Sequence, residues 1–311
     1  DGESIYFAVS NGNNPLNWTE TKNGKPYLAS TVGTRGVRDP TIIRAHDGSK
    51  FWILATDLKM NGKGDWGAAS KHGSRNIVVW ESSDLKQWSG PRLVQVSPPT
   101  VGNTWAPEAI YDTQRGHYLV FWASTLYPAN DPSHGSSSYH RILRATTKDF
   151  KTFTPAETYI DTGFSVIDTT IVYDERSARY YRFSKDERAQ NAATPNGKFI
   201  FQESSDSLMG NWRTVKVGIG KGPIARGEGP LVFASNSVRN KVGDLFDKWT
   251  GRGYVPFEST DIASGNWIPS RNYQLPKRPR HGSVIPMYDD SEWKTRTRLI
   301  DAERNRREGL C

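Results

Sequence analysis

Short runs of alternating or continuously apolar residues recur along the chain, and glycine, asparagine and aspartate separate them. The runs are rich in aromatic and β-branched side chains, whereas helical periodicity is almost absent, so strands are favoured over helices. Examples are residues 51–55, 76–80, 118–123, 180–183 and 198–201. The pattern predicts an all-β protein, with a sandwich, a barrel or a propeller as the candidate architectures.

A self-comparison decides among these architectures. A turn that ends in an aromatic residue occurs five times along the chain. The aromatic residues are Trp18, Trp88, Phe153, Trp212 and Trp267. A polar or charged residue that opens a strand falls once after each turn. These strand-openers are Asp39, Glu108, Asp168, Glu228 and His281, about 60 residues apart.

Five copies of each pattern, in strict alternation, predict a five-bladed β-propeller with about four strands in each blade. The first turn precedes the first strand-opener. We therefore expect residues 5–28 to complete the blade begun at Gly282, which would remove open sheet edges. We expect one domain over residues 1–311, in which the residues after about 300 form a tail, either a short helix or disordered.

Composition excludes several other classes of protein. The 11 Trp, 13 Tyr and 12 Phe residues are too many for a disordered chain. The single cysteine, Cys311, excludes an intrachain disulfide and a cysteine zinc site. No apolar stretch approaches the ~20 residues that span a bilayer, so we expect no membrane partner. The start at Asp1, without a methionine or a signal peptide, is typical of a processed mature end or a trimmed chain.

The formal net charge is +8, and part of it lies in residues 294–307. Elsewhere basic and acidic residues are interspersed, which is typical of a solvated surface or of attraction to acidic polymers. Nucleic-acid binding would need a basic stripe with a recognisable module, and the sequence has none, so we expect no such partner. We also expect a monomer.

The strand-openers are the candidate functional residues. In a propeller the innermost strands line a central channel, so residues about 60 apart converge at one mouth. Each opener alone has a structural explanation, because Asp and Gly are common in turns. Four acids and one imidazole facing one funnel would shift one another's pKa values, however. A stable fold does not require such a cluster of acids. The shared register of the strand-openers therefore favours a functional site.

The chemistry that these groups suit is glycosidic cleavage. It needs one carboxylic acid to protonate the leaving oxygen and one carboxylate to activate water or attack the anomeric carbon. Glu228, flanked by glycines and followed by Pro230, is the candidate acid. Asp39, which lies beside Arg38 and before Pro40, is the candidate carboxylate.

Taken together, the motifs resemble glycoside hydrolase family 43, whose members are five-bladed propellers that invert at the anomeric carbon. The motifs are Arg-Asp-Pro at 38–40, Ile-Asp-Thr-Thr at 167–170, Gly-Glu-Gly-Pro at 227–230 and Arg-His-Gly at 280–282. The resemblance implies that Asp39 is the general base and Glu228 the general acid. It also implies that Asp168 orients this acid and tunes its proton affinity. It implies that His281 holds a water molecule or a calcium ion in the channel, with no cofactor required. Arg280 would reach the sugar or the tuning aspartate.

Aromatic residues near the openers are candidates for a sugar platform. We expect Trp105 and Phe164 to bind the substrate together with Glu108, and Trp66 to join them from a glycine-rich loop at 62–67. Tryptophans also fill propeller cores, so a purely structural role is an equal alternative for each aromatic residue. The long polar loop at 127–139 is typical of a binding rim.

Two functions from different classes fit these features. The first is a secreted, inverting, exo-acting glycosidase that releases a pentose-type sugar from plant cell-wall polysaccharide or oligosaccharide. Within the family, α-L-arabinofuranosidase is the first choice, with β-xylosidase or galactofuranosidase next. The second is a non-catalytic propeller that binds glycan or protein through the same mouth. The complete set of acid, base and tuning residue favours the enzyme.

Overall fold

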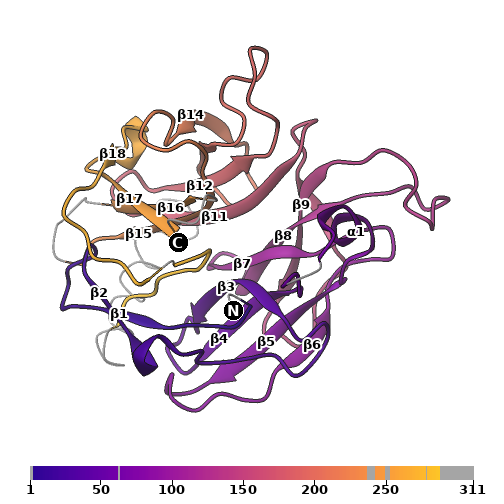
Figure 1. The fold of residues 1–311 in the computed structure, drawn as a ribbon, viewed down its shortest axis with the longest axis horizontal. Coiled ribbons are helices and arrows are strands. Elements are labelled where there is room, and N and C mark those ends of the chain that lie inside the picture. Colours follow the sequence, from indigo (N-terminus) through magenta and orange to yellow (C-terminus); the bar gives the residue numbers. More distant parts are fainter. Residues whose placement is uncertain (1–2, 62–63, 237–241, 249–252, 278, 288–311) are drawn as a thin grey trace.

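The computed structural model describes residues 3–61, 64–236, 242–248, 253–277 and 279–287, and this part is nearly all β. Four antiparallel four-stranded sheets follow one another around the molecule in Figure 1. The expected tail after residue 300 lies outside the described residues. In the described part, no helix is both long and apolar enough to cross a membrane.

Each sheet starts with its innermost strand and adds the next strands outward in chain order. The first sheet contains β3 (Val37–Arg44), β4 (Phe51–Asp57), β5 (Asn76–Ser82) and β6 (Arg92–Gln95). The second contains β7 (Trp105–Asp112), β8 (His117–Thr125), β9 (His140–Thr147) and β10 (Glu157–Ile160). The third contains β11 (Val166–Asp174), β12 (Arg179–Asp186), β13 (Ile200–Ser205) and β14 (Arg213–Ile219). The fourth contains β15 (Glu228–Ala234), β16 (Val242–Lys248), β17 (Gly253–Ser259) and β18 (Ile268–Pro269).

The fifth position of the ring is built from both ends of the chain. The two-stranded sheet of β1 (Ala8–Ser10) and β2 (Trp18–Glu20) lies between the fourth and first sheets in Figure 1. The backbone NH of Trp18 donates to the carbonyl of Gln274, and the NH of Gln274 donates to the carbonyl of Leu16. The N-terminal segment thus joins the stretch that follows β18, whereas we expected it to pair with the segment that begins at Gly282.

The segment that follows His281 differs from the expected innermost strand. In the described residues, 281–287 belong to no sheet. The side chain of Ser283, rather than a backbone ladder, holds this segment against β3. Its Oγ accepts the NH of Ile42 over 2.7 Å and the hydroxyl of Thr41 over 3.1 Å.

The core consists of hydrophobic layers between successive sheets. β4, β8 and β12 are buried along almost their whole length, because both of their faces pack against neighbouring sheets. Trp52 and Trp122 share one layer between the first and second sheets. Phe121 and Tyr180 share the layer between the second and third sheets, and Phe183 and Phe257 share the layer between the third and fourth. The sheets therefore support one another as the repeat predicts.

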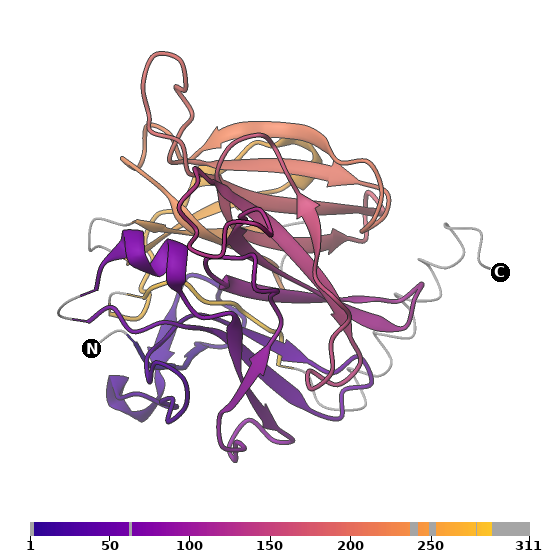
Figure 2. The same cartoon turned by 90° about the vertical axis from the view of Figure 1, so that its right-hand side faces the viewer.

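Three short helices complete the described part. They are η1 (Thr21–Gly24), α1 (Trp66–His72) and η2 (Ile262–Ser264). α1 lies at the edge of the molecule, outside the sheets, in Figure 2. Trp66, which we expected in a loop, is the first residue of α1. The carboxylate of Asp65 caps this helix by accepting the NH groups of Gly67 and Ala68.

Candidate active site

Each of the four complete innermost strands carries a bulge at the same place. The pairing register shifts between Arg38 and Thr41 in β3, and it shifts at the matching place in β7, β11 and β15. The first bulged residue has a left-handed backbone each time. These residues are Asp39 (φ 48°), Ala106 (φ 48°), Asp168 (φ 54°) and Gly229 (φ 55°). Since such a backbone is costly for a side chain larger than glycine, its repetition indicates a conformation that the sheet imposes.

The bulges refine the register of the strand-openers. Asp39 and Asp168 occupy the same position, as expected. Glu108 lies two residues after the bulged Ala106, and it therefore corresponds to Thr41 and Thr170. Glu228 lies one residue before the bulged Gly229. The four acids thus come from three different positions of the repeat rather than from one.

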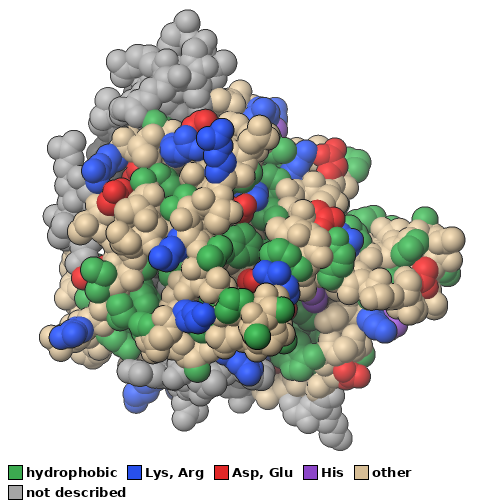
Figure 3. All heavy atoms as spheres, turned by 90° about the horizontal axis from the view of Figure 1, so that it is seen from above, with side chains coloured by type: hydrophobic (Ala, Val, Ile, Leu, Met, Phe, Trp, Pro, Cys, Tyr) green, Lys and Arg blue, Asp and Glu red, His purple; other side chains and the backbone are tan. Residues whose placement is uncertain are grey.

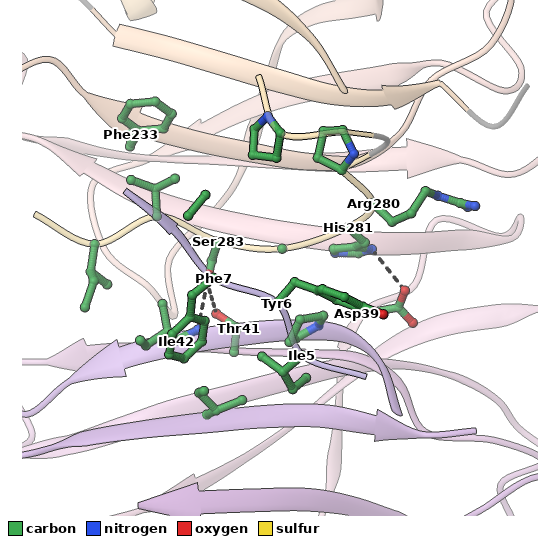
Figure 4. Close-up of a pocket in the computed structure, with 18 of the residues that line it drawn as sticks. Ile5, Tyr6, Phe7, Asp39, Thr41, Ile42, Phe233, Arg280, His281 and Ser283 are labelled. Atoms are coloured by element: carbon green, nitrogen blue, oxygen red, sulfur yellow. Dashed lines mark hydrogen bonds and ion pairs between the residues drawn. The ribbon is translucent and has the colours of Figure 1, made fainter. Parts of the chain in front are cut away.

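Asp39 and Asp168 both lie close to His281. The Nδ1 atom of His281 is 3.5 Å from Oδ1 of Asp39 and 3.9 Å from Oδ1 of Asp168. Figure 4 shows the imidazole and the Asp39 carboxylate pointing toward each other between β3 and the segment that carries Arg280. Thr56 also donates a hydrogen bond to Oδ2 of Asp39 over 3.1 Å. These contacts fix Asp39 in one orientation.

Asp168 is bound to the turn that carries Glu228. The backbone NH of Gly229 donates to Oδ2 of Asp168 over 3.0 Å. Burial raises the pKa of Asp168 to about 6, against the opposing charges of His281 and Lys185. Asp168 therefore titrates in the mildly acidic range and is hydrogen-bonded to the residue that follows Glu228.

Glu228 lies among cationic side chains. Its Oε2 is 2.7 Å from Nζ of Lys185, and its Oε1 is 3.6 Å from the guanidinium of Arg280. Lys185 is shared with Glu187, whose Oε2 is also 2.7 Å away, and Glu187 forms a second ion pair with Lys198. Arg280, which we expected to reach the sugar or Asp168, thus pairs with the carboxylate of Glu228.

The aromatic side chains Trp66 and Trp105 form one wall of the site. Their rings meet edge to face with centroids 5.9 Å apart, and Trp105 stacks on His140 at 5.1 Å. Burial lowers the pKa of His140 to about 4, so this imidazole is neutral at physiological pH. Trp66 is half-exposed, which suits an aromatic side chain that meets a sugar face.

A cavity of about 2640 Å³ joins these groups at the channel. Its lining includes the three acids Asp39, Asp168 and Glu228 and the other site residues Trp66, Trp105, Arg280, His281, His140, Lys185, Glu187 and Lys198. Two expected residues are missing from the described part of this lining. Glu108 is buried deeper, where it accepts a hydrogen bond from Thr170 over 3.0 Å. Phe164 packs into the hydrophobic layer between the second and third sheets, under the guanidinium of Arg188.

His281 was expected to hold either a water molecule or a calcium ion, and the carboxylates of Asp39 and Asp168 lie nearest to it. Calcium takes six to eight oxygen ligands. Among the residues that the structure describes, no group of three or more histidine, cysteine, aspartate or glutamate side chains is arranged to hold a metal ion. His281 instead faces two carboxylates, which suits a hydrogen-bonding role.

Most of the chain matches one known protein family. A family model described as a probable glycosyl hydrolase domain, related to glycosyl hydrolase family 43, matches residues 1–292. The chain belongs to this family. The predicted enzyme class, a glycoside hydrolase, is confirmed.

Known relatives agree with this family. The chain is 34% identical to an alpha-L-arabinofuranosidase of Bifidobacterium longum over 221 residues, which are 67% of this chain and 20% of that protein. The match thus spans about a fifth of the relative's length.

Solved structures of glycoside hydrolases share the fold. A thermostable family-43 glycoside hydrolase has a TM-score of 0.55 at 17% identity, over 83% of this chain and 82% of that one. A Penicillium chrysogenum alpha-L-arabinanase has a TM-score of 0.53 at 14% identity, over 90% of this chain and 75% of that one. These similarities confirm the propeller architecture of this glycoside hydrolase.

Sequence reasoning missed several residues of the glycoside hydrolase site. Lys185, Glu187 and Lys198 lie on or beside β12 and β13, away from the strand-openers. His140 begins β9 and reaches the site through its stack on Trp105. The one available signal was a lysine two residues after the aromatic-rich run 180–183, near the end of the predicted strand.

Proposed function

We propose that this glycoside hydrolase is a secreted, monomeric, exo-acting α-L-arabinofuranosidase that inverts the anomeric carbon and acts on plant cell-wall polysaccharide or oligosaccharide. The observation that carries the proposal is the meeting of three carboxylates from three sheets. Asp39 and Asp168 share the imidazole of His281, and the NH of Gly229 connects Asp168 to the turn of Glu228. The name of the Bifidobacterium longum relative supports the arabinofuranoside.

The three carboxylates have separate tasks in this proposal. Asp39 takes a proton from the attacking water, and Glu228 gives a proton to the leaving oxygen. Asp168 orients the Glu228 turn through the NH of Gly229. The hydroxyl of Thr56 and the imidazole of His281 both face Asp39, so they hold this carboxylate toward the channel.

In this proposal Trp66, Trp105 and Arg280 bind the substrate. Trp105 and Trp66 offer stacking surfaces for sugar rings, and Arg280 supplies hydrogen-bond donors beside Glu228. Glu108 takes no part in this wall, because it is buried and accepts a hydrogen bond from Thr170. On the face drawn in Figure 3, side chains of both charges are interspersed between hydrophobic ones, which suits a neutral glycan.

A panel of substrates tests the proposal. The purified protein is assayed with nitrophenyl α-L-arabinofuranoside, β-D-xyloside and β-D-galactofuranoside, and the highest kcat/KM is expected for the arabinofuranoside. Proton NMR of the first-formed sugar should show the inverted anomer. A preference for the xyloside or galactofuranoside would replace the named substrate, and a retained anomer would overturn the mechanism.

A further inference from the structure

A buried lysine connects the proposed acid to a second carboxylate. The side chain of Lys185 is 7% exposed, and its Nζ is 2.7 Å from Oε2 of Glu228 and 2.7 Å from Oε2 of Glu187. Burial alone would lower the pKa of Lys185, but the charges of Glu228 and Glu187 raise it above its usual value. The ammonium is therefore charged, and it is held between two anions.

The register of the sheets gives Lys185 a counterpart elsewhere in the site. Lys185 of β12 pairs with Ile167, which directly precedes the bulged Asp168. Thr56 of β4 pairs with Arg38 in the same way, directly before the bulged Asp39. Thr56 holds the carboxylate of Asp39, and Lys185 holds the carboxylate of Glu228 in the neighbouring sheet. The second strand of a sheet thus supplies, at one fixed place, a donor for a carboxylate of the site.

We propose that Lys185 is the positioning residue of Glu228, and that its charge stabilises the carboxylate that remains once Glu228 has protonated the leaving oxygen. The inference rests on the proposed function. In that step the proton leaves Oε1 of Glu228, the oxygen that faces Arg280, and bonds to the glycosidic oxygen. The bond from the anomeric carbon to that oxygen breaks, and its electron pair stays on the departing oxygen. The negative charge left on Glu228 then faces the ammonium at Oε2.

The charges around Glu228 favour this direction of transfer. Lys185 and Lys198 balance Glu187 and an ionised Glu228, whereas a protonated Glu228 leaves one positive charge in excess. Arg280 adds to that excess, and the buried Asp168 opposes it. An attraction that grows as the carboxylate forms stabilises the transition state more than the ground state, which is the condition for catalysis.

Replacing the lysine tests this role. Lys185→Met keeps the length of the side chain and removes its charge. On an arabino-oligosaccharide, whose leaving group needs a proton, kcat should fall by about 10²-fold. On nitrophenyl arabinofuranoside, whose leaving group needs little help, kcat should fall only severalfold. The basic limb of the pH profile of kcat/KM on the oligosaccharide should move to higher pH, because the ammonium that favours the ionised carboxylate is lost.

Glu187→Gln is the second variant, and it should act in the opposite direction. It keeps Lys185 and removes an anion from the cluster, so the basic limb should move to lower pH. The inference is overturned if the two variants move the limb in the same direction or not at all. It is also overturned if Lys185→Met slows both substrates equally. Lys185→Arg, which keeps the charge, should recover part of the lost kcat.

Arg182→Met is the matched control for the loss of a buried ion pair. Arg182 lies on the same strand, its side chain is also 7% exposed, and its Nε is 2.5 Å from Oε2 of Glu203. This variant should lose stability in thermal unfolding but should show no selectivity between leaving groups.

Glu228→Gln distinguishes a failure of the proposed function from a failure of the role proposed for Lys185. If it fails to slow the oligosaccharide selectively, the proposed function fails, whereas a selective effect of Glu228→Gln without one of Lys185→Met defeats only the role of the lysine.

Discussion

The hydroxyl of Thr56 donates a hydrogen bond to Oδ2 of Asp39 over 3.1 Å. Oγ1 of Thr56 also accepts the backbone NH of Ala106 over 2.8 Å, so this fully buried side chain binds the first sheet to the second. The orientation of the proposed base therefore depends on the contact between two sheets.

Thr56→Val should weaken both activity and stability. The variant keeps the shape of the side chain but cannot donate to Asp39 or accept from Ala106. The buried NH left without an acceptor should lower the free energy of unfolding by about 1–3 kcal/mol, measured by urea titration. Activity should fall about tenfold on every substrate, because water attack is common to all of them. Thr56→Ser keeps the oxygen and should stay near the parent protein. If it were as impaired as Thr56→Val, the methyl group rather than the hydrogen bonds would be responsible.

Asp39 and Glu228 should respond differently to the leaving group. Asp39→Asn removes the base and should slow nitrophenyl and oligosaccharide substrates by similar factors, about 10²–10⁴-fold. Glu228→Gln removes the acid and should slow the oligosaccharide far more than the nitrophenyl glycoside. Steady-state kcat values on both substrates measure the difference. The reverse pattern would exchange the two roles.

Glu108 should make the stability of the protein depend on pH. Burial raises its pKa from 4.5 to about 7, against the opposing effects of His281 and the hydrogen bond from Thr170. The native state keeps this proton where the unfolded chain releases it. The stabilisation is therefore fully present below pH 4.5 and is lost as the pH rises to about 7. At 1.36 kcal/mol per unit, the loss amounts to about 3 kcal/mol.

Glu108→Gln removes this dependence, because an amide does not titrate. Relative to the parent protein, the variant should gain free energy of unfolding between pH 5 and pH 8, measured by chemical denaturation at both values. Glu157→Gln, at an exposed position of β10, is the control and should show no such gain. An equal pH dependence of the parent protein and Glu108→Gln would contradict the prediction.

The sequence predicted the architecture well, because its repeats reflect the sheets directly. Asp39 and Asp168 share one position of the repeat, as the spacing predicted, since both stand at the bulge. Glu108 was expected at the wall but lies deeper, because one residue of register decides which way a strand side chain points and the bulge adds to that shift. No rule of spacing along one strand reveals such an insertion.

Tertiary contacts explain the residues that the sequence did not reveal. A lysine at the end of a strand usually extends into solvent, and only the approach of Glu187 and Glu228 makes Lys185 a buried cation. The glycines around Trp66 favoured a loop, yet the cap provided by Asp65 is sufficient to start α1 there. In both cases a contact with a neighbouring side chain decides the structure against the preference of the local sequence.

Gly229→Ala should reduce activity more than stability. At φ 55° an added Cβ is strained, and it would lie 3.1 Å from Cγ of His281. Displacing the imidazole disturbs its contacts with Asp39 and Asp168. Gly163→Ala is the matched control, because it has φ 76° and nothing within 4 Å of an added Cβ. Both variants should lose about 1 kcal/mol of stability in thermal unfolding. Only Gly229→Ala should lose activity, and equal activities would contradict the role assigned to this contact.

The last described segment of the chain brings His281 to carboxylates that were synthesised long before it. All four four-stranded sheets are complete by Pro269, so a nascent chain of that length already has the strands it needs to fold them. It still lacks the imidazole between Asp39 and Asp168, and it lacks Ser283, which binds to β3. During translation, the four folded sheets would therefore precede both the closed ring and a competent enzyme, because Gln274 and residues 281–283 emerge last.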